Sequence, residues 1–308
     1  MNDVTALVAF SVQTLTYAAP LLLAALGEVF TERAGVVNIG LEGLMIAGAL
    51  AAVVVAVVTG SPWFGVGAAL LAGLALSALF ALFGVGLKRD QVIVGTTINF
   101  LALGLTGVLF RAWTGASGSV PAAPTLPHIA GAGPTAVNAV TLFALALVPL
   151  AGWLLFRTRL GVTLRTAGEM PEAAAAAGAF VNRLRVVTVI AAGALAGLAG
   201  ADLAVGINNG FTENMTGGRG FIALAIVVFG RWRPLGVLGA SLLFAAADVA
   251  QAQLQAVPAV QSWVARLGLG DTYPLFLALP YVLTLVALAV RGAKGRAPAA
   301  LGRPFEQG

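Results

Sequence analysis

The sequence has no cysteine and a single histidine, His128, among its 308 residues. The lack of cysteine excludes disulfides, thiolate metal sites and cysteine nucleophiles. One histidine cannot build a histidine-rich metal site, and it leaves little material for a catalytic triad. We therefore expect no enzymatic activity, no metal site and no cofactor, and we expect His128 to be a solvated loop residue.

Charge is also scarce, since only 9% of the residues are charged and 59% are hydrophobic. Soluble domains carry about 25% charged residues, so this composition indicates a membrane protein. Basic residues lie between apolar runs, which argues against a nucleic-acid partner, because such a partner needs a clustered basic face. No polar stretch is large enough to form a separate domain, so we predict one membrane domain over residues 1–308, surrounded by lipid.

A transmembrane helix needs about 20 mainly apolar residues. The apolar runs predict nine spans near 8–27, 36–59, 62–87, 91–112, 138–156, 186–206, 219–230, 235–256 and 274–291. The seventh is too short and follows a segment rich in Asn and Gly, which predicts a broken helix. In the sixth, a face formed by Gly193, Gly197 and Gly200 predicts close helix packing. The predicted fold class is all-α, a polytopic membrane helical bundle with one or two broken helices.

The distribution of basic residues predicts an orientation, because Lys and Arg are enriched in cytoplasmic loops. With the amino terminus outside and the carboxyl terminus inside, 14 of the 17 basic residues lie on the cytoplasmic side. They are Arg33, Lys88, Arg89, Arg157, Arg159, Arg165, Arg183, Arg185, Arg231, Arg233, Arg291, Lys294, Arg296 and Arg303. The opposite orientation would invert this ratio.

The longest polar stretch is the predicted cytoplasmic loop 157–185. It contains a compact helix signal, with Pro171 at the start, Glu172 in the first turn and Gly178 as the stop. A short helix rich in alanine would form a rigid knob for the groove of a partner protein. The residues alone leave a plain connecting helix equally open.

The spacing of Glu172, Ala173 and Ala174, followed after three residues by Gly178, resembles the coupling loop of ABC importer permeases. Four further segments resemble the branch of these permeases that serves simple sugars and nucleosides and is related to branched-chain amino acid transport: 35–43, 157–161, 193–200 and 218–225. The resemblance covers roughly residues 28–256. Residues 187–192 depart from the pattern, because they lack the proline that follows the motif in many ABC permeases.

This resemblance implies a permease subunit of an ATP-driven importer in a bacterial cytoplasmic (inner) membrane, moving nucleosides or simple sugars inward. The implied partners are a nucleotide-binding ATPase subunit, a second permease (related or identical) and an extracytoplasmic solute-binding protein. ATP hydrolysis belongs to the separate subunit, since neither Lys88 nor Lys294 is followed by the Ser or Thr of a P-loop. Coupling to the ATPase is assigned to Glu169, Met170, Pro171, Glu172, Ala173, Ala174 and Gly178.

Polar residues inside spans are costly and mark cavities or helix contacts. The candidates for a solute path are Asn38, Glu42, Thr96, Asn99, Asp248 and Gln251. Asn38 and Glu42 would either line the path or pin a neighbouring helix, and we favour lining. Thr96 and Asn99 form a similar pair, whereas Asp248 and Gln251 form either a polar wall of the path or a solvated helix end. A secondary transporter driven by an ion gradient is the alternative function; it would need such residues too, but no docking helix. An intramembrane enzyme would need a nucleophile and base, or metal ligands, and this sequence supplies no such set.

Overall fold

The computed structural model describes residues 3–115, 122–131, 133–255, 257 and 297–306, and most of these residues are helical. The long helices are α1 (Asp3–Arg33), α2 (Leu41–Thr59), α3 (Pro62–Phe80), α4 (Gln91–Thr114), α5 (Ala139–Arg157), α8 (Val181–Ala201) and α10 (Pro234–Gln255). The shorter helices are α6 (Arg159–Glu169), α7 (Pro171–Ala176) and α9 (Arg219–Phe229). The π-helical segments η1 (Ala81–Gly86) and η4 (Asp202–Ile207) extend α3 and α8. Beside the 3₁₀ turn η3 (Gly133–Thr135), strands β1 (His128–Ala130) and β2 (Val137–Asn138) pair antiparallel.

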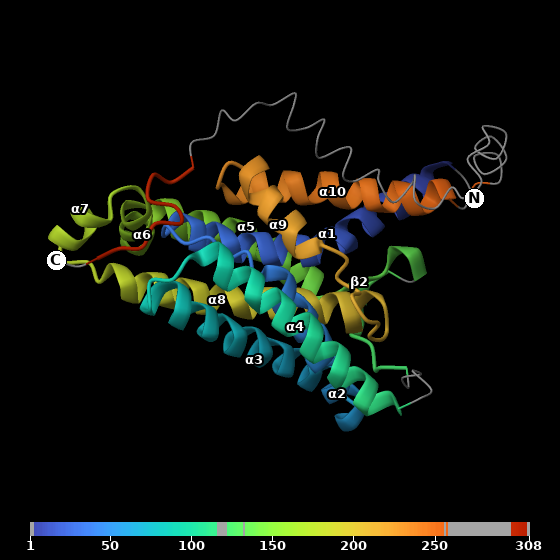
Figure 1. The fold of residues 1–308 in the computed structure, drawn as a ribbon. Helices are drawn as coiled ribbons and strands as arrows, with labels where there is room; N and C mark the ends of the chain where they lie inside the picture. The colour runs from blue at the N-terminus through green and yellow to red at the C-terminus, as the bar shows by residue number, and fades with distance from the viewer. Residues whose placement is uncertain (1–2, 116–121, 132, 256, 258–296, 307–308) are drawn as a thin grey trace, which may run out of the picture.

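The long helices run lengthwise through one bundle (Figure 1). Helices α6 and α7 lie at one end of the bundle together with the carboxyl end of the chain, and the amino end lies at the other. We call these the α7 end and the opposite end. Seven described helical segments are long and apolar enough to cross a membrane, and α9 is a shorter apolar helix. This arrangement confirms the prediction of a polytopic membrane helical bundle.

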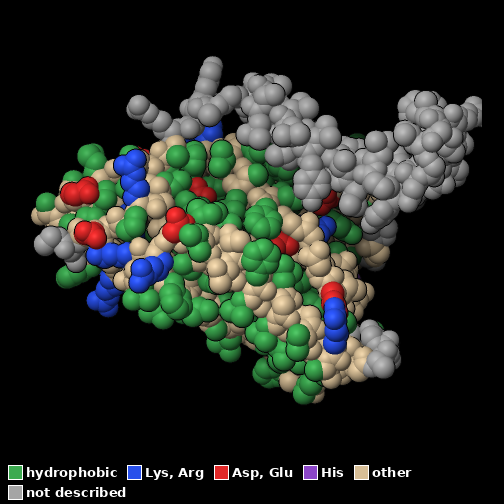
Figure 2. Space-filling model, in the orientation of Figure 1, with side chains coloured by type: hydrophobic (Ala, Val, Ile, Leu, Met, Phe, Trp, Pro, Cys, Tyr) green, Lys and Arg blue, Asp and Glu red, His purple; other side chains and the backbone are tan. Residues whose placement is uncertain are grey.

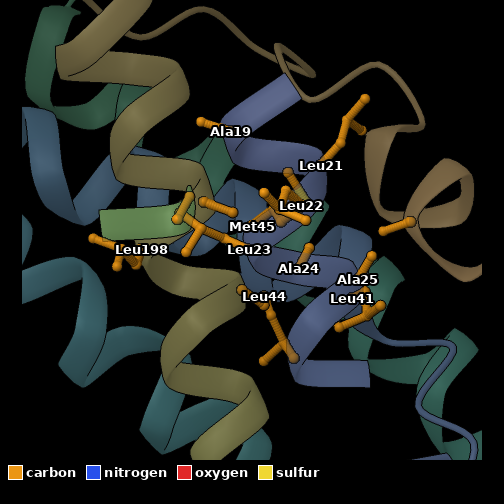
Figure 3. Packing of buried hydrophobic residues seen from close by; sticks show 14 of the residues in the cluster. Ala19, Leu21, Leu22, Leu23, Ala24, Ala25, Leu41, Leu44, Met45 and Leu198 are labelled. Atoms are coloured by element: carbon orange, nitrogen blue, oxygen red, sulfur yellow. The ribbon is translucent and has the colours of Figure 1, made fainter. Parts of the chain in front are cut away.

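The centre of the bundle is built from α1, α2 and α8. Figure 3 shows Leu22 and Leu23 of α1 beside Met45 of α2 and Leu198 of α8, all of them buried. Lipid chains are as apolar as these side chains, so the packing of helix against helix depends on shape and close contact rather than on exclusion of water.

The predicted glycine face of α8 provides that close contact. A methyl group on Gly197 would collide with the backbone carbonyl of Ala69 in α3, and one on Gly200 with the carbonyl of Met45 in α2. Gly193 lies equally close to Ser77. The packing prediction for this face is therefore confirmed, and α8 packs closely against both α2 and α3.

The outer helices expose large apolar side chains, including Leu71 of α3, Phe100 and Leu105 of α4 and Trp153 of α5. Figure 2 shows hydrophobic side chains spread over the middle of the molecule, with Lys and Arg gathered toward the α7 end. Large apolar side chains facing outward along whole helices are the surface that a lipid bilayer covers.

Each of the first eight predicted spans contains an observed helix, whereas the ninth, 274–291, lies outside the described residues. Four boundaries differ by five residues or more. Helix α1 begins at Asp3 instead of 8, and α8 begins at Val181 instead of 186. Helix α1 continues to Arg33 instead of ending near 27, because Glu28, Glu32 and Arg33 all find partners inside the protein. Helix α2 begins at Leu41 instead of 36, after an irregular segment in which Gly35 has a φ of 90°.

Candidate functional site

The predicted loop 157–185 forms two helices, α6 and α7, at one end of the bundle (Figure 1), and its last five residues belong to the long helix α8. Helix α6 was not predicted from the sequence. Its start is fixed by Thr158, whose hydroxyl accepts the N–H of Gly161 at 3.1 Å in an N-cap. The threonine before a periodic segment was the signal that could have revealed it.

Helix α7 has the boundaries that its sequence predicts. Pro171 occupies the first turn, where a missing N–H costs nothing, and Glu172 follows it. Gly178 has a φ of 87°. Its N–H donates to the carbonyl of Ala175 at 2.9 Å, and the next N–H, of Ala179, donates to the carbonyl of Ala174 at 3.0 Å. This pair of bonds is the Schellman ending of a helix, so the predicted stop at Gly178 is confirmed.

The two faces of α7 differ. Pro171 and Ala174 are buried against the protein, whereas Glu172, Ala173 and Ala176 are exposed. Ala174 is therefore a packing residue, and a partner protein would contact its exposed neighbours.

Two large apolar residues flank the exposed face of α7. Met170 is 60% exposed and Phe180 is 71% exposed, and both precede a helix start rather than lying within a long span. Because they lie next to the exposed face of α7, these two side chains are candidates for a protein contact. Phe180 was not among the predicted coupling residues, and the helical signal of the loop does not reveal it.

A cluster of buried polar contacts lies where α2 and α9 begin. Glu42, 3% exposed, accepts hydrogen bonds from the N–H of Gly218 at 2.9 Å, the N–H of Gly220 at 2.7 Å and the hydroxyl of Thr216. Its carboxyl group thus satisfies donors at the amino end of α9, where the helix dipole favours negative charge. Glu42 joins two helix starts that are more than 170 residues apart in sequence.

Asn99 and Asn38 hold the irregular segment before α2. The Asn99 amide accepts the N–H of Gly43 at 2.8 Å and donates to the carbonyl of Ile39 at 2.9 Å. The N–H of Asn38 donates to Glu28 at 2.8 Å, and its side-chain oxygen accepts the N–H of Gly40 at 3.0 Å. Backbone groups at membrane depth need such partners, because no bulk water supplies them.

The remaining path candidates lie elsewhere. Asp248 of α10 forms an ion pair with Arg219 at 3.6 Å, and Gln251 lies three residues further on the same helix face, half-buried. The hydroxyl of Thr96 donates to the carbonyl of Val92 in its own helix at 2.8 Å. The structure thus brings Asn38, Glu42 and Asn99 together around the start of α2, places Asp248 at the start of α9, and leaves Thr96 apart.

Asp202, a buried residue, was not among the candidates predicted from the sequence. It begins η4 and accepts a hydrogen bond from the side chain of Asn138 at 2.8 Å, and both residues are buried. A lone acidic residue directly after a long apolar run was the available signal.

At the end of α4, Arg111 forms two hydrogen bonds of 2.7 Å with the carboxylate of Glu213, in the loop before α9. This bidentate contact lowers the pKa of Glu213 below its ordinary value. The loop between η4 and α9 is therefore tied to α4 by an exposed ion pair.

Comparisons with known proteins cover nearly the whole chain. A family profile described as the permease component of branched-chain amino acid transport systems matches residues 10–288. The guanosine ABC transporter permease protein NupQ of Bacillus subtilis is 36% identical over 96% of this chain and 95% of its own length. The nucleoside ABC transporter permease protein NupC of Lactococcus lactis is 32% identical over 98% of both chains.

A third relative is the putative glucose ABC transporter permease protein TsgC13 of Haloferax volcanii, 38% identical over 79% of this chain and 77% of its own. No solved structure matches the chain significantly.

Proposed function

Because this chain belongs to the family of branched-chain amino acid transport system permease components, we propose that it forms the membrane pathway of an ATP-driven importer for nucleosides. The observation that carries the proposal is the match, over 96% of the chain, to a guanosine ABC transporter permease. A helical bundle with a short helix displayed at one end is the architecture that such a subunit needs.

Nucleosides are favoured over free sugars as the solute, because two nucleoside permeases match a larger share of this chain. The nucleoside permeases NupQ and NupC match 96% and 98% of the chain, whereas the glucose permease TsgC13 matches 79%. A nucleoside carries the hydroxyl groups of a sugar together with base nitrogens, and amide and carboxylate side chains pair with both kinds of group.

We assign different roles to the six path candidates. The polar atoms of Glu42 and Asn99 are engaged by backbone and hydroxyl partners, so these residues hold the broken backbone, as does Asn38. Asp248 and Gln251, beside Arg219 and partly accessible, are the residues that contact the solute. Thr96 bonds within its own helix and supports α4.

The coupling partner is a nucleotide-binding ATPase subunit, and its docking surface is the exposed part of Glu169, Met170, Glu172, Ala173 and Gly178, joined by Phe180. Pro171 and Ala174 support this surface from beneath. A second permease completes the channel, and an extracytoplasmic binding protein delivers the solute. ATP binding and hydrolysis take place on the ATPase subunit.

The test is uptake into proteoliposomes that contain the chain with its ATPase, second permease and binding protein. We expect labelled guanosine to accumulate only with ATP on the ATPase side, and unlabelled nucleosides to compete better than glucose. Competition by glucose alone would reassign the substrate to sugars. Uptake that does not require ATP and depends on an ion gradient would identify a secondary transporter and overturn the proposal.

We further propose that the α7 end faces the cytoplasm of a bacterium and that the chain lies in its inner membrane. The chain has no native cysteine, so single cysteines report sidedness cleanly. A cysteine at His128, exposed in β1, is expected to react with an impermeant thiol reagent from outside, and one at exposed Ala176 only from inside. Reversed labelling would overturn the orientation.

A further inference from the structure

The chain returns to the α7 end in residues 297–306, drawn in red in Figure 1, which we call the C-terminal strap. It runs beside α6 and the turn after α1. The N–H of Ala300 donates to the carbonyl of Gly168 at 2.9 Å, and the N–H of Gly302 donates to the carbonyl of Gly35 at 3.1 Å. The N–H of Ala299 donates to the carboxylate of Glu169 at 3.2 Å. Backbone bonds to both segments fix the path of the strap without depending on side-chain identity.

Arg185 of α8 lies where the strap, α6 and the turn after α1 meet, which we call the junction. It is 1% exposed, and no acidic side chain pairs with it in an ion pair among the described residues. Its guanidinium donates to the carbonyls of Ala34 at 2.9 Å, Arg303 at 2.9 Å and Ala167 at 3.5 Å. A buried charge requires such partners, so Arg185 binds together the turn after α1, helix α6 and the C-terminal strap.

Phe305 supplies the apolar part of the junction. It is 6% exposed and forms a buried cluster with Ala167 of α6, Ala174 of α7 and Val181 of α8. Helix α7 has only six residues, and Ala174 is the one alanine that it buries. Isolated helices shorter than about 12 residues are marginal even for alanine-rich sequences, so α7 needs an apolar surface to hold it. The aromatic ring of Phe305 is the largest side chain in its cluster.

We propose that the C-terminal strap is an integral part of the ATPase docking surface. Phe305 packs against α7, and Arg185 holds the strap in place through the carbonyl of Arg303, so that α7 keeps the position in which the ATPase subunit binds it. The inference rests on the proposed function for the identity of the partner, whereas the packing on which it depends is independent of that partner. Phe305 and Arg185 are positioning residues; neither needs to touch the ATPase itself.

The packing is tested with a cysteine at Ala174, which Phe305 helps to bury, in otherwise wild-type protein and together with Phe305→Ala. We expect labelling of the cysteine by a maleimide to rise by about tenfold or more when the ring is removed, because α7 then opens more often. Arg303→Ala is the matched control, since the Arg303 side chain is exposed and only its backbone carbonyl is used. A cysteine at exposed Ala176 should react equally in every background.

The docking is tested in the same proteins by co-purification of the ATPase subunit. We expect Phe305→Ala to lose the subunit while the membrane bundle keeps its thermal midpoint, and Arg303→Ala to retain the subunit. Unchanged labelling at residue 174 in Phe305→Ala would overturn the strap inference.

Increased labelling with full ATPase retention would overturn the dependence of docking on the strap. Failure of the wild type to bind any ATPase subunit would overturn the proposed function, and with it the docking part of this inference. The labelling result would then still report whether the strap holds α7.

Discussion

Glu42 and Gly220 contact each other through side chain and backbone at once. The Glu42 carboxylate accepts the Gly220 N–H at 2.7 Å, and a methyl group on Gly220 would collide with the backbone of Glu42. The first turns of α2 and α9 therefore meet at a position where only glycine fits. There the carboxylate accepts the N–H groups that have no partner within α9.

This contact predicts that Glu42→Gln destabilises the bundle. The amide keeps one acceptor oxygen and turns its NH₂ group toward donors, so the free energy of unfolding should fall by roughly 1–3 kcal/mol. The measurement is thermal unfolding of the purified protein in detergent, with the exposed Glu306→Gln as the control. If Glu42→Gln unfolds like the wild type and still loses uptake, Glu42 contacts the solute instead.

The role assigned to α10 predicts a different result for Asp248→Asn and Gln251→Ala. We expect these variants to fold and to bind the ATPase normally, while the solute concentration for half-maximal uptake rises by up to about tenfold per lost hydrogen bond. Gln253→Ala, on the same helix but exposed and bonded to Gln13, should transport normally. Parallel loss of folded protein and uptake would instead assign Asp248 to holding Arg219.

Local signals in the sequence were sufficient for the helices and for α7. Pro171 and Gly178 act within a few residues of their own positions, and the apolar runs report lipid contact directly, so the first eight spans and the α7 boundaries were predictable.

The roles of Glu42, Asn99 and Arg185 were not predictable in this way. Each bonds to backbone groups more than 50 residues distant. Every residue other than proline carries the same backbone groups, so the sequence does not show which of them a side chain will bond to. Whether a buried polar residue lines a path or caps a helix is decided by such distant partners. For the same reason nothing in the sequence linked Phe305 to Ala174, although both were visible as residue types.

The two faces of α7 give a further prediction. Ala173→Arg and Ala176→Arg add bulk and charge to the exposed face, so the bundle should remain intact while the ATPase subunit fails to co-purify and uptake is lost. Ala174→Arg should behave differently, because Ala174 is 2% exposed and a buried charge without partners destabilises the junction itself. Thermal unfolding separates the two cases. Normal ATPase binding by Ala173→Arg and Ala176→Arg would remove α7 from the docking surface.

The ion pair between Arg111 and Glu213 predicts a pH-dependent link between α4 and the loop before α9. Arg111 lowers the pKa of Glu213 in the folded protein, so the pair stabilises the loop above the unfolded value of about 4.3. That contribution is lost as the pH falls through the lower folded value. The effect should be small and sensitive to salt, because both side chains are exposed.

The link is measured by amide hydrogen exchange in residues 209–218, always as the ratio of Glu213→Gln to wild type, so that the intrinsic pH dependence of exchange cancels. We expect the variant to exchange faster at pH 7 and the ratio to approach one well below pH 4. Arg111→Glu should raise the exchange rate more than Glu213→Gln does, since it places two carboxylates together. The double exchange Arg111→Glu with Glu213→Arg should restore protection, because it rebuilds the pair with its charges reversed. A ratio that stays the same at every pH would show that the loop is held by other contacts.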